Sequence, residues 1–591
     1  MIKNTFVKLS LSQITASISS MLCLLIDSIM IGRLLGVQAM SSYGLASPLI
    51  IIFAGIMLMI VCGTQMTVAT AVGKGDLDEI SKCYSTSLII SLSISVLVTL
   101  LIYTAAHPIC ILLGAEKANV PVEVKEMTIQ YLKGYFIGSP FIFLSQLMMP
   151  YLQTMGRRKE ILTSVLCMTA SDIVFNIISI YVFHAGIFGI GVASGLSYLV
   201  AFLTVGGYFL KKECIFKFIF RNISPDTAYK IIKAGSPLLL VQACYVARVY
   251  SFNQLFLFLG GTDAVAVFSI VTVPAEVLYR IGLGSAEVTL TMSSLLYGDE
   301  DRGGLIELIK AMFIYTLIYI SAAVLFVCAA APWIISIYVP HDFALFDSGV
   351  TALRLFAVSF IPACISCVFE KYYLGTRQTG LVNISSVCEG LILTASFAWI
   401  FGLCFGLDGV WIGVNVGQIA TLLVISLFIW RKAGKISFSP ETYSYLDKDF
   451  GVDQDNITNL SVSDIETAES ASEKIYEFYL KRGNGKREAM LISLCAEEIA
   501  INIIEHGFKA DNRKHSMEIR TVQKDDRITL RFRDDCVSFD PTEYVAMNNM
   551  DNGVEHIGLR MIMKMVDDAV YINSLGLNNL MLSIKVVMNY E

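Results

Sequence analysis

Long apolar segments dominate the first 430 residues and limit what this part of the chain can form. Twelve of them reach the length of roughly 20 residues that a helix needs to cross a bilayer: 9–31, 45–70, 84–106, 129–153, 161–183, 187–210, 231–259, 264–296, 305–333, 350–374, 381–403 and 407–430. They lack the two-residue alternation of a membrane β-barrel. Because backbone groups in lipid must be hydrogen-bonded internally, the segments are predicted to be helices of an all-α polytopic membrane domain.

The density of charged side chains divides the chain into two parts. Residues 441–591 contain 44 charged side chains, or 29%, with a net charge of −10, whereas the first 440 residues contain 50, or 11%, with a net charge of +4. Soluble domains usually have about 25% charged residues. The C-terminal part is therefore predicted to be soluble. The net charge of the whole chain is −6 and it has no long basic cluster, so no nucleic-acid partner is expected.

The loops between the predicted helices differ in basic residues. When the N-terminus is placed on one side of the bilayer, the segments on that side carry 17 Lys and Arg, and the loops on the other side carry 3. Loops rich in Lys and Arg stay in the cytoplasm. We therefore expect an integral protein of the plasma (inner) membrane with both termini, and the soluble domain, in the cytoplasm.

The apolar part contains a weak internal repeat. The segment YLQTMGRRKEIL at 151–162 is similar to YLGTRQTGLV at 373–382, and GKGDLDEISK at 73–82 is similar to YGDEDRGGLIELIK at 297–310. Six predicted helices separate the copies, so the two halves have the same orientation, as in transporters with a cavity between two lobes. The predicted organisation is an N-lobe at 1–210, a linker at 211–230, a C-lobe at 231–432, a second linker at 433–455 and a soluble domain at 456–591.

Ionisable residues within the predicted helices mark candidate sites, because each costs about 2.5–3.5 kcal/mol at the membrane centre. Asp27 in the first helix is the leading candidate for binding a proton or a sodium ion. Asp172 and Asn176 are four residues apart, so they share a helix face and can offer ligands to the same cation or to Asp27. Three further residues are candidate charge or substrate sites: Gln242, Glu276 and Arg280. The last two are four residues apart and are expected to form an ion pair, although Glu276 could instead bind a cationic substrate.

The twelve-helix plan, the segment IDSIMIGRLLG, the loop GKGD and the segment GIFGIGVASG resemble the multidrug and toxic compound extrusion (MATE) transporters over residues 8–432. The resemblance implies efflux of small organic, often cationic, compounds driven by entry of protons or sodium ions. It also places the first-helix aspartate of that family at Asp27. The order Asp172 then Asn176 reverses the usual order in the fifth helix, and the seventh helix lacks an acid. This pattern favours ion coupling through the N-lobe.

The soluble part has the pattern of an α/β sandwich. Helices are predicted at 463–480 and 486–507, and two strands flank a polar turn at 523–527. A further helix is predicted for the segment HIGLRMIMKMVDDAV, and a pair of strands is predicted for YINSLGLNNLMLSIKVVM. Glu498 and Asn502 are four residues apart on the second helix, so a carboxylate and an amide share one face that can hold a hydrated Mg²⁺.

The order of these elements, with FRDDCVSFDP after a strand and GLNNLMLSIK at the end, resembles the GHKL ATP-binding fold over 456–591, in particular the anti-sigma-factor serine kinases. The resemblance implies binding of Mg-ATP and gives four residues family roles: Glu498 as general base, Asn502 as Mg²⁺ ligand, Asp534 as acceptor for the adenine amino group, and Gly558 in the loop over the phosphates. Cys536, Ser538 and His556 stand where that family commonly has glycine. The sequence therefore leaves open whether the domain hydrolyses ATP, only binds it, or serves as a protein-binding platform.

Three functions are consistent with these patterns. The leading prediction is an ion-coupled antiporter whose soluble domain senses ATP or recruits a cytosolic regulatory protein. ATP is not expected to drive transport, because the sequence has no GxxxxGK[ST] phosphate loop. The alternatives are a membrane-anchored ATPase or serine kinase with a sensory membrane part, and a flippase for a lipid-linked sugar, which Arg248 and Arg280 would favour.

Overall fold

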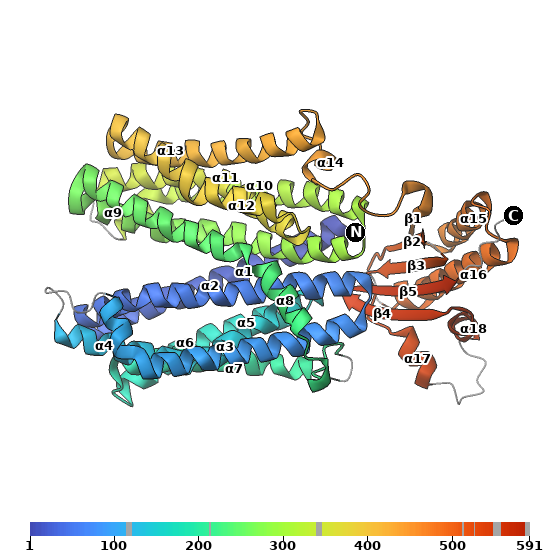
Figure 1. Ribbon diagram of the computed structural model, residues 1–591, viewed down its shortest axis with the longest axis horizontal. Coiled ribbons are helices and arrows are strands. Elements are labelled where there is room, and N and C mark those ends of the chain that lie inside the picture. The colour runs from blue at the N-terminus through green and yellow to red at the C-terminus, as the bar shows by residue number, and fades with distance from the viewer. Residues whose placement is uncertain are drawn as a thin grey trace.

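A bundle of long helices meets a compact sheet domain end to end (Figure 1). The computed structural model describes residues 1–113, 121–211, 214–337, 345–510, 513–524, 526–547 and 557–585. The apolar part of the sequence forms the helix bundle, and the charged part forms the sheet domain. The uneven distribution of charge thus corresponds to a physical division of the chain.

The first half of the bundle, the N-lobe, consists of seven helices in the described residues: α1 (Ile2–Met30), α2 (Val37–Lys74), α3 (Leu77–Leu112), α4 (Val122–Ile137), α5 (Ser139–Thr154), α6 (Arg158–Tyr181) and α7 (Gly186–Phe209). A π-helical turn, Ile31–Leu35, continues α1. The predicted helix at 129–153 is divided between α4 and α5 at Gly138. A Cβ atom at Gly138 would lie 2.2 Å from the Cα of Gly195, so this break allows close packing against α7.

A short helix, α8 (Pro225–Gly235), begins in the predicted linker and packs against α2. The second half, the C-lobe, then contains α9 (Pro237–Gly298), α10 (Arg302–Ser336), α11 (Leu345–Gly375), α12 (Thr379–Val387), a π-helical turn (Cys388–Ile392) and α13 (Leu393–Ala433). Two of these helices are kinked at glycines with positive φ, Gly261 in α9 (63°) and Gly406 in α13 (69°). This backbone conformation favours glycine. Each kink lies between two predicted membrane spans.

The prediction of an all-α membrane domain is confirmed. Each predicted span falls on helical residues, although its ends differ from the helix ends by several positions. In the described ranges, nine helical stretches have the length and hydropathy of a membrane span, and one of these, Thr379–Ala433, contains two predicted spans.

The two lobes pack against each other at the end of the bundle that faces the sheet domain, which we call the domain side. A Cβ atom at Gly73 would lie 2.1 Å from the carbonyl oxygen of Leu295, and one at Gly298 would lie 2.2 Å from that of Thr70. Glycines therefore bring α2 and α9 into backbone contact there.

The sheet domain alternates helices with antiparallel strands. Its elements are β1 (Ile457–Val462), α15 (Ile465–Lys481), α16 (Lys486–Asn502) with a π-helical turn (Ile503–Phe508), β2 (Met517–Lys524), β3 (Arg527–Asp534), α17 (Pro541–Met547), α18 (Ile557–Met565), β4 (Asp568–Ser574) and β5 (Leu577–Lys585). The strand order is β1-β2-β3-β5-β4. The predicted α/β sandwich is confirmed, but β1 and α17 were not predicted.

One predicted helix of this domain is too long. It was expected to continue to Val570, yet α18 ends at Met565 and Asp568 begins a strand. The backbone N–H of Asp567 donates to the carbonyl of Ser583 at 2.9 Å, and its carboxylate accepts from the N–H of Lys585. Pairing with β5 therefore overrides the helical periodicity of this segment.

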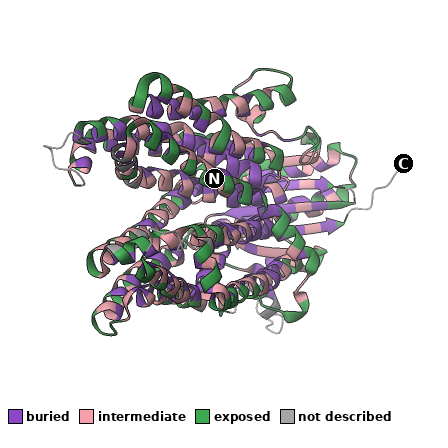
Figure 2. Ribbon diagram, turned by 60° about the vertical axis from the view of Figure 1, so that its left-hand side comes forward, coloured by how far each residue is buried: buried purple, intermediate pink, exposed green. Residues whose placement is uncertain are grey.

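The two faces of the sheet have different neighbours. Ile519, Leu530 and Phe532 belong to the apolar core under α15, α16 and α18. Because side chains alternate along a strand, Arg520 and Arg531 lie on the opposite face, toward the helix bundle. Figure 2 shows that most of the sheet is buried, so both of its faces are covered.

Candidate functional sites

The N-lobe brings two buried carboxylates together around one amide. The Nδ2 of Asn176 donates to the Oδ1 of Asp27 at 2.7 Å and to the Oδ2 of Asp172 at 3.2 Å. The hydroxyl of Ser194 on α7 donates to the Oδ2 of Asp27 at 3.3 Å. Asp27 is 7% exposed, and the two α6 residues are fully buried. Asp172 and Asn176 thus share one face of α6 beside Asp27, as their spacing predicts, and α7 adds Ser194, which was not predicted.

A small cavity of about 50 Å³ adjoins this group and includes both carboxylates. Its other lining residues are aromatic, aliphatic or hydroxylated: Ser20, Tyr43, Ile50, Tyr131, Tyr135, Ser194, Ser197 and Tyr198. None of the described lining residues is basic. Buried carboxylates need a counter-charge or a proton, and this space is suited to a small cation rather than to an organic molecule.

The C-lobe holds a larger cavity of about 300 Å³ that contains paired charges. The Nζ of Lys371 lies 3.4 Å from the Oε1 of Glu287, and the two atoms belong to α11 and α9. The predicted pair of Arg280 and Glu276 is present at 4.0 Å. A third pair joins Arg248 to Glu389 at 3.9 Å. Gln242 and Glu370 also line the cavity.

Sequence reasoning did not identify Lys371 as a site residue. The feature that could have identified it is its position within the predicted span at 350–374, next to Glu370. The lysine is 4% exposed, so it neutralises acids inside the lobe. The candidate residues of the C-lobe therefore form a nearly self-neutralised group of four acids and three bases.

The sheet domain contains a cavity of about 390 Å³ beside the end of α16. Asp534, at the end of β3, lines it and is 4% exposed. Its Oδ1 accepts from the Nδ2 of Asn578 at 2.8 Å and from the N–H of Cys536 at 3.0 Å. Burial raises the pKa of the Asp534 carboxyl, and these hydrogen bonds oppose the rise. Asn578 in turn accepts from the hydroxyl of Tyr571 at 2.7 Å, and neither partner was predicted.

The residues that the family resemblance assigns to Mg²⁺ and phosphate lie close together beside this cavity. The Nδ2 of Asn502 donates to the Oε1 of Glu498 at 3.1 Å, and Asn502 lines the cavity. Gly558 in the first turn of α18 lies directly against Glu498, because a Cβ atom there would be 1.7 Å from the Glu498 Oε1. A carboxylate and an amide oxygen are suitable ligands for Mg²⁺, and a helix N-terminus stabilises phosphate. His556 lies outside the described residues.

Both parts of the chain match known families. Residues 13–182 match the MatE family, and residues 463–584 match the histidine kinase-like ATPase domain. The multidrug export protein MepA of Staphylococcus saprophyticus is 23% identical over 430 residues, covering 71% of this chain and 92% of MepA. MepA of Staphylococcus aureus is 22% identical over 431 residues, with the same shares covered.

Solved structures share the fold of the membrane part. The outward-facing conformation of a multidrug resistance MATE family transporter of the MOP superfamily has a TM-score of 0.68 and 22% identity, with 73% of this chain and 96% of that chain covered. A MOP superfamily transporter from Pyrococcus furiosus has a TM-score of 0.67, with the same identity and shares covered. The chain therefore joins a MatE domain, within a membrane part that has the fold of MATE transporters, to a C-terminal histidine kinase-like ATPase domain.

Proposed function

We propose that this protein is an antiporter that exports organic cations and takes up protons or sodium ions, with both termini in the cytoplasm. The observation that supports it is the N-lobe group of Asp27, Asp172 and Asn176, which buries two carboxylates beside a cavity whose described lining has no base. A proton or sodium ion that binds here neutralises one of the two carboxylate charges, and each charge that crosses the whole membrane gains about 2.3 kcal/mol for each 100 mV of membrane potential. Coupling then requires that the cation and the exported compound favour different arrangements of the lobes.

The composition of the C-lobe cavity supports an organic cation over a lipid-linked sugar phosphate as the substrate. Arg248 and Arg280 each lie beside a glutamate, so neither presents an unpaired positive charge to a phosphate. Glu276 also accepts from the hydroxyl of Tyr245 at 3.5 Å, which places an aromatic ring beside a carboxylate. This combination favours cationic, partly apolar molecules.

We further propose that the sheet domain binds Mg-ATP and regulates export. Asp534 would accept the adenine amino group, while Asn502 and Glu498 would hold the metal and a water beside the phosphates. Bound Mg-ATP supplies a phosphate chain that a helix N-terminus can stabilise. Because β1 begins at Ile457, we take this domain to begin at residue 456.

The test is export from proteoliposomes that contain the full-length protein and a fluorescent organic cation such as ethidium. We expect export under an imposed proton or sodium gradient without ATP, and no coupled export by an Asp27→Asn variant. ATP-driven export without an ion gradient would show instead that the protein is a primary pump. Export by Asp27→Asn at the wild-type rate would contradict the role of the N-lobe site.

A further inference from the structure

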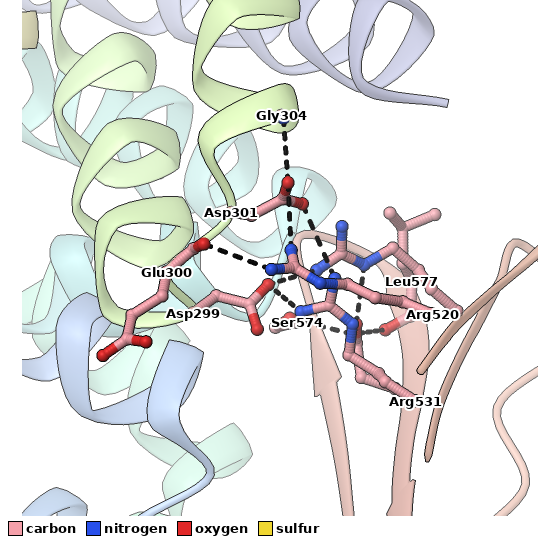
Figure 3. Close-up of polar contacts among 10 residues, drawn as sticks. Asp299, Glu300, Asp301, Gly304, Arg520, Arg531, Ser574 and Leu577 are labelled. Atoms are coloured by element: carbon pink, nitrogen blue, oxygen red, sulfur yellow. Dashed lines mark hydrogen bonds and ion pairs between the residues drawn. The ribbon is translucent and has the colours of Figure 1, made fainter. Parts of the chain in front are cut away.

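The sheet domain docks onto the C-lobe through a buried cluster of charges (Figure 3). The turn between α9 and α10 carries Asp299 and Asp301. Arg531 forms ion pairs with both, and Arg520 pairs with Asp301 at 2.9 Å. Arg533 reaches Asp299 at 3.4 Å. The three arginines are 6–7% exposed, so these charges are removed from water by docking.

The turn that contacts the sheet also joins two membrane helices, α9 and α10. The carboxylate of Asp301 accepts from the N–H of Gly304 at 2.9 Å and so caps the first turn of α10. The carbonyl of Glu300 accepts from Arg520 at 3.1 Å, and its side chain pairs with Lys524 at 3.3 Å. The sheet therefore holds the end of α9 and the start of α10 in one position.

The same sheet face also contacts the N-lobe. The N–H of Leu575, in the turn between β4 and β5, donates to the carbonyl of Thr154 at the end of α5, at 2.7 Å. A Cβ atom at Gly156 would lie 2.1 Å from the nitrogen of Gly576, so the two turns touch through their backbones. Gly75, in the turn between α2 and α3, lies against the side chain of Met581 of β5.

One sheet thus bridges both lobes on the domain side. The turns at 73–76 and 298–301 are equivalent positions of the internal repeat, and each contacts the sheet. A hydrogen-bonded sheet is too stiff to follow two lobes that move apart. Opening of the transporter on this side therefore requires the sheet to release at least one lobe.

The docking contacts and the proposed nucleotide cavity lie on opposite faces of the same sheet. Asp534 and Asn578 are register partners on β3 and β5 and bond to each other on the cavity side. The preceding residue of β3 and the following residue of β5, Arg533 and Asn579, are also register partners and bond to each other on the docking side at 2.8 Å. The amide of Asn579 then donates to the hydroxyl of Ser574, beside the turn that contacts the N-lobe. Each residue of the cavity pair is therefore adjacent in its strand to a residue of the docking side. A movement of β3 and β5 at the cavity would move the contacts with the C-lobe and with the N-lobe.

We propose that the sheet domain is a clamp that holds the two lobes together on the domain side, and that nucleotide in the adjacent cavity sets how tightly the clamp engages. This inference rests on the proposed function for the assignment of the cavity to a nucleotide. Linkage is reciprocal, so complete loss of docking must change nucleotide affinity by the same factor by which nucleotide changes docking, and a partial loss changes it by less.

The experiment compares two variants of the full-length protein that remove the same charge. Asp299→Asn/Asp301→Asn acts at the docking cluster, and Glu469→Gln/Glu473→Gln acts on exposed residues of α15. Hydrogen–deuterium exchange reports the Leu575 N–H, whose partner is Thr154. We expect faster exchange there only in the docking variant, and a dissociation constant for Mg-ATP that differs from wild type by at least about 5-fold.

The outcomes separate this inference from the proposed function. Equal exchange at Leu575 in the docking and control variants would overturn the clamp, whether or not the protein exports cations. Faster exchange with an unchanged dissociation constant would overturn the link to nucleotide. Neither readout requires transport, so export that survives Asp27→Asn would contradict the proposed antiport while leaving the clamp supported by its own measurements.

Discussion

Asp27 in the N-lobe and Asp534 in the sheet domain are buried aspartates with almost the same first partner. They are 7% and 4% exposed. Each accepts a hydrogen bond from an asparagine amide, Asn176 at 2.7 Å and Asn578 at 2.8 Å. Their local chemistry therefore does not explain why one would bind a cation and the other a neutral donor.

The two sites differ in what else the asparagine amide binds. The amide that binds Asp27 also binds the carboxylate of Asp172, so this site concentrates negative charge beside a cavity of about 50 Å³. The amide that binds Asp534 otherwise donates to the carbonyls of Cys536 and Val537, and Asp534 faces a cavity of about 390 Å³. Two carboxylates that share one amide favour a small cation, whereas a single carboxylate beside a larger cavity leaves room for a neutral donor.

If the second carboxylate makes the N-lobe a cation site, Asp172→Asn should abolish coupled export, as Asp27→Asn does. The substitution preserves shape and removes one of the two charges that attract the cation. Initial rates of ethidium export under an ion gradient measure the effect. Asp408→Asn changes an exposed acid and should retain the wild-type rate. Full coupling in Asp172→Asn would show that one carboxylate is sufficient.

The C-lobe shows a third arrangement, in which a half-buried acid, Glu287, is paired with a buried base, Lys371. Lys371→Met should destabilise the protein by about 3 kcal/mol, because it leaves Glu287 without its partner inside the lobe. Adding Glu287→Gln should recover most of the loss, since the unpaired charge is then removed. Thermal unfolding of the detergent-purified protein provides the measurement. Equal unfolding temperatures for the single and double variants would mean that the pair is not electrostatically important.

Asp534→Asn should raise the dissociation constant for Mg-ATP by about tenfold or more, because a hydrogen bond to a charged acceptor contributes about 1.5–3 kcal/mol. The loss is smaller than at the N-lobe because the ligand keeps its other contacts. Isothermal calorimetry on the full-length protein tests this, with Asp568→Asn at the exposed start of β4 as the matched control. Unchanged affinity would place the adenine elsewhere.

Much of the architecture could be predicted because its signals are local. Segment length and hydropathy indicated the membrane helices, and the spacing of Asp172 and Asn176 indicated one helix face. The same rule predicted the contact between Glu498 and Asn502. In each case the relevant geometry lies within a single element.

What could not be predicted depends on which elements meet. The pattern of β3, RITLRFRD, alternates polar and apolar residues as in a strand with one face in water. Arg531 and Arg533 lie on the polar face of this strand, yet the turn before α10 buries them. Alternation identifies the two faces of a strand but carries no information on what covers the polar one. Lys371 was missed for the same reason, since its partner is on another helix.

The smallest expected effect is a pH dependence of adenine binding at Asp534, which depends on whether its carboxyl is charged. Burial raises the pKa of Asp534, so its carboxylate gains a proton at a higher pH than an exposed aspartate, whose pKa is about 3.9. A protonated carboxyl is a poorer acceptor, and affinity for the adenine ring should fall several-fold as pH decreases through this raised pKa. Adenosine is the suitable ligand, because it has no phosphate to titrate. Its affinity for Asp534→Asn should show a flatter dependence over the same range. An identical pH profile in both proteins would mean that the adenine amino group does not bind this carboxylate. The difference between the Asp27 and Asp534 sites would then rest on the size of their cavities rather than on the other partners of the asparagine amide.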